Sequence, residues 1–184
     1  MNQVLIALGS NVEKEKNVPA ALALLRAQPA MAICAISPLY ETTPIGGDGS
    51  PSGQPAFHNG ALLVETALSP AALRDLLRQM EALLGRTRGA DKFAARPIDL
   101  DIAMVRQLAT DAIGAQMSDT ADQENVQVDP DILRFIHLSV PLADVAPDWI
   151  VPQTGETLRH VAERHRRQNC AKDSQIPRKI RESI

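Results

Sequence analysis

The chain has 184 residues, of which 45% are hydrophobic, 22% are charged and 3% are aromatic, and its net charge is -3. This length and apolar content suit one domain with a sizeable core, and the charge excludes binding of polyanions through overall charge. The two cysteines, Cys34 and Cys170, are too few for a disulfide framework or a zinc cluster. The N-terminal segment lacks a basic region and no apolar run could span a membrane, so the cytoplasm is the expected location.

The first half of the chain predicts alternating strands and helices. A buried strand is expected at residues 4–8, and a helix at 20–27 follows Asn17, which is a suitable N-cap. A second strand is expected at 30–40. Residues 42–56 contain four glycines and three prolines, and a structureless stretch of this length is usually a functional loop.

The second half begins with clearer signals. A strand is expected at 57–66, a helix runs from the Ser69 cap to about residue 84, and another strand ends near 105. Weaker signals follow, and they predict a mobile acidic loop at 107–133, a short strand at 136–140, a connector at 141–150 and a helix at 155–166.

The order strand, helix, strand, strand, helix, strand predicts an α+β fold. We expect a ferredoxin-like sandwich, with a mainly antiparallel sheet, helices packed on it and mobile active-site loops; other small α/β sandwiches remain open. Residues 1–167 form one expected domain, and 168–184 form a polar, basic tail that is expected to be flexible. The tail lacks interleaved aromatic residues, so no nucleic-acid partner is predicted. No membrane partner is expected either, because no apolar run is long enough to span a bilayer. The monomer is the default oligomeric state.

A short alternating run, Ile98 to Ile102, carries the strongest chemical signal. On a strand, Asp99 and Asp101 share one face, roughly 6–7 Å apart, while the isoleucines and Leu100 face the core. Two carboxylates this close repel each other unless a cation lies between them. Mg²⁺ with oxygen ligands is the simplest such cation, and the alternative is an ordinary solvated strand face.

Basic residues precede these aspartates at Arg86, Arg88, Lys92 and Arg96. Carboxylates for a metal beside several cationic donors predict a nucleotide-dependent phosphoryl-transfer site. The alternative is a solvated basic loop, and for Lys92 the two interpretations are balanced. Glu81, in the last turn of a predicted helix, either pairs with an arginine or serves the site.

Six short motifs follow one another along the chain in a specific order and spacing. They are IALGSN at 6–11, SPLYETTPIG at 37–46, QPAFHNGA at 54–61, the E-x4-R-x-R element that starts at Glu81, RPIDLDI at 96–102 and VPLADVAPDW at 140–149. In this order and spacing, the chain resembles the 6-hydroxymethyl-7,8-dihydropterin pyrophosphokinase family of folate biosynthesis. The resemblance implies transfer of pyrophosphate from ATP to the pterin hydroxymethyl group, with release of AMP and with two Mg²⁺ ions bridging the aspartates and the ATP phosphates.

The resemblance also assigns roles to individual residues. The expected catalytic residues are Arg86, Arg96, Asp99 and Asp101, of which the two aspartates bind the metal. The expected ATP-binding residues are Arg86, Arg88, Lys92, Arg96 and Ile102. The expected pterin-binding residues are Thr42, Thr43, Pro44, Ile45, Phe57, Asn59, Phe93 and His137. Phe57 stands where the family has a ring-stacking tyrosine, and Glu81 matches an acidic residue beneath the active site.

The chain departs from the family pattern at three positions near residue 130. Asp129 stands where a phosphate-contacting histidine is expected, Phe135 where an arginine is expected, and His137 where a stacking phenylalanine is expected. A shift of one or two residues would instead place Arg134 and Phe135 near those roles. Each charge-assisted phosphate contact is worth about 1.5–3 kcal/mol, so the loss of two cations predicts weaker ATP binding or slower turnover.

This departure leaves a second interpretation open. The chain could be a divergent paralogue that binds a pterin or a partner, or that acts on a different pterin alcohol, with weak or absent kinase activity. Just before the aspartates, Ala94 and Ala95 replace a family glycine-proline pair, and Phe93 replaces a tryptophan.

Overall fold

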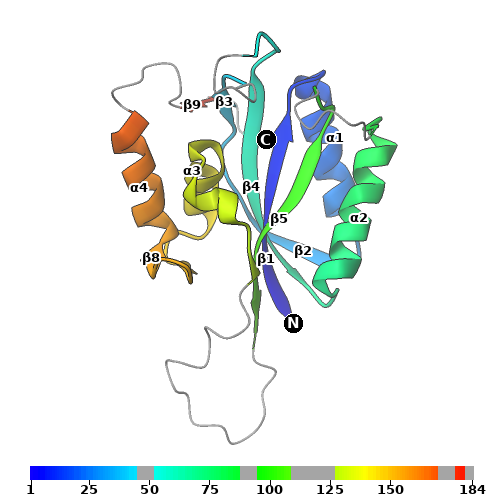
Figure 1. Ribbon diagram of the computed structural model, residues 1–184. Helices are drawn as coiled ribbons and strands as arrows, with labels where there is room; N and C mark the ends of the chain where they lie inside the picture. The colour runs from blue at the N-terminus through cyan, green and yellow to red at the C-terminus, as the bar shows by residue number, and fades with distance from the viewer. Residues whose placement is uncertain (45–51, 88–94, 109–126, 170–176, 181–184) are drawn as a thin grey trace, which may run out of the picture.

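The computed structural model describes residues 1–44, 52–87, 95–108, 127–169 and 177–180 (Figure 1). The strands of its main sheet are β1 (Asn2–Ser10), β2 (Met31–Ile36), β3 (Tyr40–Thr42), β4 (Phe57–Thr66), β5 (Asp99–Gln107), β6 (Gln127–Val128) and β9 (Arg178–Lys179). The helices are α1 (Lys14–Arg26), α2 (Pro70–Leu83), α3 (Ile136–Val145) and α4 (Leu158–Asn169), with a 3₁₀ turn, η2, at Pro130–Leu133. A separate hairpin joins β7 (Ile150–Val151) to β8 (Glu156–Thr157).

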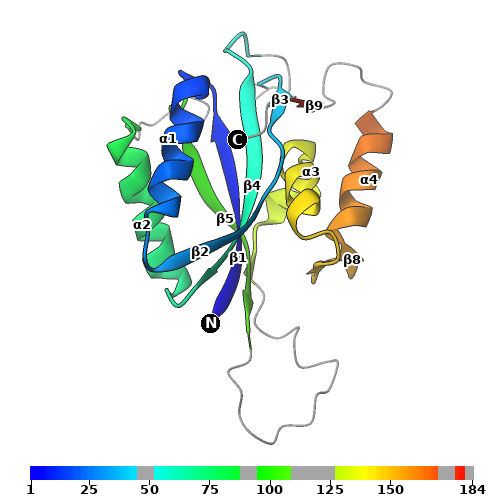
Figure 2. The same cartoon turned by 180° about the vertical axis from the view of Figure 1, so that it is seen from behind.

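The main sheet is antiparallel and runs in the order β6-β5-β1-β4-β3-β9, with β2 also paired to β4. Strand β1 therefore lies at the centre, between β4 and β5. This order, together with α1 and α2 on one face, confirms the predicted ferredoxin-like α+β fold. Helices α3 and α4 cover the opposite face (Figures 1 and 2), so the molecule has three layers.

Each face of the sheet has its own hydrophobic core. Ile6 and Leu62 pack against α1 and α2, while Leu5 and Ala61 pack toward α3 and α4. This alternation follows from the two-residue period of a strand. Every helix in the described part of the chain is too short or too polar to cross a lipid bilayer.

A bulge in β5 keeps both cores apolar. Leu5 pairs with Met104 and Ile6 pairs with Ile102, so Ala103 is an extra residue in β5. Ala103 and Met104 consequently both lie in the core beneath α3 and α4. Before the bulge the strict alternation holds, and it leaves Asp99 and Asp101 on the α3 side of the sheet.

Three predicted elements differ from the structure. The strand expected at 30–40 divides into β2 and β3 around Pro38, which has no backbone N–H for a sheet ladder. The first helix begins at Lys14 rather than at residue 20, and Asn17 lies inside it, where its side-chain amide donates to the Val12 carbonyl over 2.7 Å. Inside the loop expected at 107–133, β6 and η2 are formed, while residues 109–126 lie outside the described residues.

The short strand expected at 136–140 is wrong, because these residues form the first half of α3. Ile136 and Val140 pack against Tyr40 and Ala162, while Leu142 packs into the core below the sheet. A helix that lies between a sheet and another helix is apolar on more than one side, and its sequence then lacks a clear helical period. Pro141 lies within this helix.

Residues 177–180 belong to the segment that was expected to be a flexible tail, but they lie against the edge of the sheet. Arg178 and Lys179 pair with Glu41 and Tyr40 of β3, and the Ile180 N–H donates to the Leu39 carbonyl over 2.8 Å. Helix α4 continues to Asn169, past the domain boundary expected at 167. Residues 170–176 and 181–184 lie outside the described residues.

Candidate active site

Four neighbouring strands place the predicted aspartates and the predicted pterin residues on one face of the sheet. Asp99 on β5 pairs with Gly9 on β1, Gly9 pairs with Asn59 on β4, and Asn59 pairs with Tyr40 on β3. Side chains of directly paired residues point to the same side. Two strand spacings separate Asp99 from Asn59, so their backbones lie about 10 Å apart.

Gly9 occupies the middle of this row, and no role was predicted for it from the sequence. A Cβ atom at position 9 would lie 3.2 Å from Asn59 Oδ1 and 3.9 Å from both Asp99 Cβ and Phe57 Cδ1. Side chains from β4 and β5 therefore converge over a residue that has no side chain of its own. The signals in the sequence were a glycine directly after a buried strand and its place in the IALGSN motif.

The pterin residues form a polar pair beside an aromatic ring. The buried Asn59 donates through Nδ2 to Thr42 Oγ1 over 2.7 Å. In this bond Thr42 Oγ1 is the acceptor, so the Thr42 hydroxyl hydrogen and Asn59 Oδ1 point away from each other's partner atom. Together they provide one donor and one acceptor, which suit the edge of a planar heterocycle. Phe57 pairs with Thr42 across the strands and adds a ring face on the same side.

The neighbouring predicted pterin residues are only partly described. Thr43 is exposed and Pro44 is buried, with the Pro44 carbonyl accepting from the Ser52 N–H over 3.0 Å. The predictions for Ile45, Phe93, Arg88 and Lys92 fall outside the described residues.

Asp99 is held by two arginines. One carboxylate oxygen accepts from Arg86 and the other accepts from Arg96. Burial favours the protonated form of Asp99, but the charges of Arg96 and Arg86 outweigh it and lower the pKa of this carboxyl. Asp99 is therefore ionised at neutral pH.

Glu81 lies beneath Asp99 and Arg86 and is 1% exposed. Its carboxylate accepts from the Leu100 backbone N–H over 2.8 Å and also pairs with Arg86. Burial opposes the charge of Arg86, but Asp99 and Glu81 outweigh it and raise the pKa of the guanidinium. The carboxylate of Glu81 thus fixes both the strand that carries the aspartates and the arginine that faces them.

Asp101 differs from Asp99 in its partners. Among the described residues, no basic nitrogen lies within ion-pair distance of its carboxylate, which is at the exposed surface. Partial desolvation, followed by the charges of Asp99 and Glu81, raises the pKa of Asp101 to about 6. A cation that approached Asp101 would relieve this repulsion.

The donor set suits Mg²⁺ that arrives with a nucleotide. Within the described ranges, no group of three or more His, Cys, Asp or Glu side chains is placed to hold a metal ion. Mg²⁺ commonly uses one or two carboxylates and completes its shell with water and substrate phosphates. Asp99 and Asp101 could supply those carboxylates. The Ile102 side chain, in contrast, packs on the opposite face, so the structure does not bring it to the aspartates.

The segment that departs from the family pattern is occupied with its own contacts. The Asp129 carboxylate caps η2 by accepting from the Asp131 N–H over 2.9 Å, and Arg134 pairs with Asp131 at 3.0 Å. The Arg134 guanidinium lies 5.1 Å from the centre of the Phe135 ring, and Phe135 stacks on His137 at 5.3 Å. Desolvation lowers the pKa of His137 to about 4, so this ring is neutral at pH 7.

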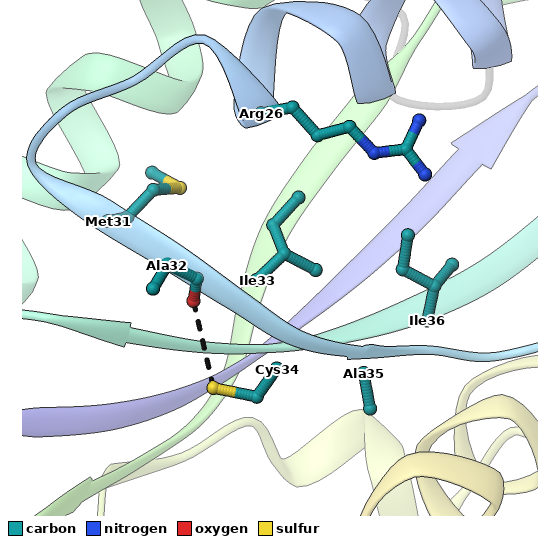
Figure 3. A pocket seen from close by; sticks show the side chains of 7 residues that line it. All are labelled: Arg26, Met31, Ala32, Ile33, Cys34, Ala35 and Ile36. Atoms are coloured by element: carbon teal, nitrogen blue, oxygen red, sulfur yellow. Dashed lines mark hydrogen bonds between the residues drawn. The ribbon is translucent and has the colours of Figure 1, made fainter.

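A hollow lies at the other end of the sheet from Phe57 and Asn59. It has a volume of about 440 Å³ and is lined by Arg26 and by β2, Met31–Ile36 (Figure 3). Its polar side chains are Arg26 and the exposed thiol of Cys34, whose sulfur lies 3.8 Å from the Ala32 carbonyl oxygen. Because β2 pairs with residues 62–66 of β4, this hollow is remote from Phe57 and Asn59.

Known proteins match this arrangement. The profile of the 7,8-dihydro-6-hydroxymethylpterin-pyrophosphokinase family matches residues 5–147. This chain belongs to that family. Two bacterial relatives are each named 2-amino-4-hydroxy-6-hydroxymethyldihydropteridine pyrophosphokinase. The Pseudomonas aeruginosa protein is 33% identical over 153 residues, which cover 83% of this chain and 85% of the relative. The Methylorubrum extorquens protein is 33% identical over 160 residues, which cover 86% and 90%.

The fold recurs in a solved structure. The Plasmodium falciparum HPPK-DHPS protein superposes with a TM-score of 0.64 at 14% identity, over 98% of this chain and 47% of that chain. This chain therefore spans about half the length of that larger protein. At 14% identity this similarity shows a shared fold and nothing further.

Proposed function

We propose that this chain transfers pyrophosphate from ATP to 6-hydroxymethyl-7,8-dihydropterin, in a reaction that depends on Mg²⁺. The observation that carries the proposal is the single row that joins Asp99 to Asn59 across Gly9. This row provides an anionic, arginine-backed end and a polar, aromatic end about 10 Å apart on one face. The two named relatives support the same reaction.

The chain's own residues supply binding and positioning. Asp99 and Asp101 would hold Mg²⁺, which would supply positive charge to the phosphates during the transfer. Arg86 and Arg96 stabilise negative charge on the transferred group. Asn59 and Thr42 orient the pterin ring so that its hydroxymethyl group faces the phosphates. Such positioning and electrostatic stabilisation contribute most of the catalysis in this class of reaction.

The test is direct. Purified protein is mixed with ATP, Mg²⁺ and 6-hydroxymethyl-7,8-dihydropterin, and AMP is followed by mass spectrometry. AMP should form only when the pterin is present. Turnover that is unchanged in the Asp99→Ala, Asp101→Ala double variant would rule out the proposed role of these aspartates.

A second candidate function has its own support. Asp129 caps η2, and Phe135 contacts Arg134 and stacks on His137. The two positions where the family has a histidine and an arginine therefore carry no cation. A paralogue that binds a pterin without kinase activity would show pterin affinity but no Mg²⁺-dependent affinity for a non-hydrolysable ATP analogue. A calorimetric titration with each ligand separates the two functions. Repeating the AMP assay with other pterin alcohols tests whether the substrate differs.

Three further predictions stay predictions. They are a single domain over residues 1–167, a monomeric state and a location in the cytoplasm. Two Mg²⁺ ions per active site are likewise part of this proposal and can be counted by titration in the presence of the ATP analogue.

A further inference from the structure

The last residue of β1 and the residues that follow it contact two separate segments of the site. On one side, the Asn11 and Val12 N–H groups both donate to the Arg96 carbonyl, over 3.1 and 3.2 Å, and the Ser10 hydroxyl donates to the Pro97 carbonyl over 2.6 Å. On the other side, Lys14 donates to the Ala56 carbonyl over 2.8 Å. The first segment leads into Asp99, and the second leads into Phe57 and Asn59.

The side chain of Asn11 contacts both segments at once. Its Oδ1 accepts from the Arg96 N–H over 2.7 Å. Its Nδ2 donates to Gln54 Oε1 over 3.2 Å and approaches the Pro55 carbonyl at 3.4 Å. Because an N–H must meet an acceptor and a carbonyl must meet a donor, these contacts fix the orientation of the amide. Asn11 is 3% exposed, so water does not replace these bonds readily.

We infer that the Asn11 amide couples the arginine-bearing segment to the pterin-side segment and positions each relative to the other. This inference rests on the proposed function, since the two segments are read as the ATP side and the pterin side. Asn11 is a positioning residue, which acts through the backbone of Arg96 and through Gln54. A carboxamide is required because the two segments present opposite hydrogen-bonding groups.

Three substitutions separate the contacts. Asn11→Asp keeps an acceptor for the Arg96 N–H but removes the donor toward Gln54 and Pro55. Asn11→Ala removes both contacts. Gln54→Ala shortens the pterin-side partner alone and leaves Asn11 intact. Asn2→Ala is the matched control, because Asn2 lies at the other end of β1 and donates to the Leu68 carbonyl over 2.9 Å.

The first measurement is backbone hydrogen exchange of the unliganded protein, which requires no activity. Asn11→Ala should speed exchange of the Arg96 amide and of residues 52–58, by about three- to tenfold, the range that one neutral hydrogen bond contributes. Asn11→Asp should speed exchange at 52–58 while the Arg96 amide stays protected. Asn2→Ala should change neither segment.

The second measurement separates the two substrates kinetically. Asn11→Asp and Gln54→Ala should raise the KM for the pterin about three- to tenfold and leave the KM for ATP unchanged, whereas Asn11→Ala should raise both. Equal effects of Asn11→Asp and Asn11→Ala on both segments would overturn the inference, as would unaltered exchange at Arg96 in Asn11→Ala. A wild-type protein that forms no AMP would instead contradict the proposed function, and the exchange data would still decide the coupling.

Discussion

The aspartate end of β5 and the segment from η2 to the start of α3 differ in how their charged groups find partners. At β5, Asp99 and Glu81 hold Arg86 against the face that a substrate would approach. In the η2 segment, Asp129 caps its own turn and Arg134 pairs with Asp131 three residues away. At β5 the partners come from different elements and preorganise charge toward a ligand, whereas partners within the η2 segment stabilise that segment itself.

This comparison extends to the two aspartates of β5. Asp99 has two cationic partners and a lowered pKa, while Asp101 has a raised one. One carboxylate is therefore already stabilised by the protein, and the other needs a cation from outside. Substitution of Asp101 should consequently lower activity alone, whereas substitution of Asp99 should lower both activity and stability.

The largest expected effect is on activity. Asp101→Asn should lower kcat by about 10²–10³, comparable to the loss of one preorganised electrostatic contact. The same change should leave the melting temperature unchanged or higher, because it removes a like charge from beside Asp99 and Glu81. Initial rates of AMP formation and thermal unfolding of the same samples provide the two measurements.

Asp99→Asn is the matched variant. It should lose a similar amount of activity, and the free energy of unfolding should also decrease by about 3 kcal/mol, since the partly buried Arg86 then keeps, among the described residues, only Glu81 as an ion-pair partner. A decrease in stability that is equal for both variants would remove the distinction between the two aspartates.

Restoring a family cation tests the η2 side of the comparison. Phe135→Arg should raise affinity for a non-hydrolysable ATP analogue about tenfold or more, as expected for one charge-assisted phosphate contact. Phe135→Leu serves as the control, because it removes the stack on His137 without adding charge. If arginine and leucine give the same affinity, position 135 does not face the phosphates in this chain.

The η2 segment should also respond to pH. His165 on α4 is buried, its Nδ1 accepts from the Ser139 hydroxyl over 2.7 Å, and its Nε2 donates to the Leu133 carbonyl over 3.1 Å. Burial lowers the pKa of His165, of His58 and of His137. Below pH about 6.5 the unfolded chain binds protons that the folded chain does not, so the free energy of unfolding decreases as the pH falls.

The size of this effect can be bounded. Protonation of His165 leaves Ser139 facing an added N–H, and such an unsatisfied buried contact costs about 1–3 kcal/mol. Urea titrations between pH 5 and 8 should show the decrease, and His165→Gln should make it shallower, with His58 and His137 accounting for the remaining slope. His160→Gln, an exposed position on the same helix, should keep the wild-type profile. Identical slopes for both variants would assign the pH dependence to other groups.

Local signals in the sequence were sufficient for some elements and insufficient for others. The alternation from Phe57 and the cap at Ser69, whose Oγ accepts from the Ala72 N–H over 3.2 Å, predicted β4 and α2 correctly. The pattern at 136–140 failed because its apolar residues contact both the sheet and α4. Burial by two layers removes the period on which such a prediction depends.

The same division applies to the site. The alternation in RPIDLDI placed Asp99 and Asp101 on one face, as the strand register requires. The different partners of the two aspartates, and the bridging contacts of Asn11, could not be predicted locally. The bond from Asn11 to Arg96 joins residues 85 positions apart, so it depends on the completed sheet.

The smallest expected effect concerns the position where the family pattern has a histidine. Asp129→Ala should lower the free energy of unfolding by about 1 kcal/mol, the usual cost of a lost N-cap. Asp129→Asn should cost only a fraction of this, because its amide oxygen can still accept from the Asp131 N–H. Chemical denaturation of both variants measures the difference.

The ATP affinity of the same variants tests a second role. If Asp129 is only a structural cap, Asp129→Ala should bind ATP as the wild type does. If its carboxylate faces the phosphates, repulsion weakens binding, and Asp129→Ala should bind ATP more tightly. The two variants therefore decide whether Asp129 only caps η2 or also weakens the binding of ATP.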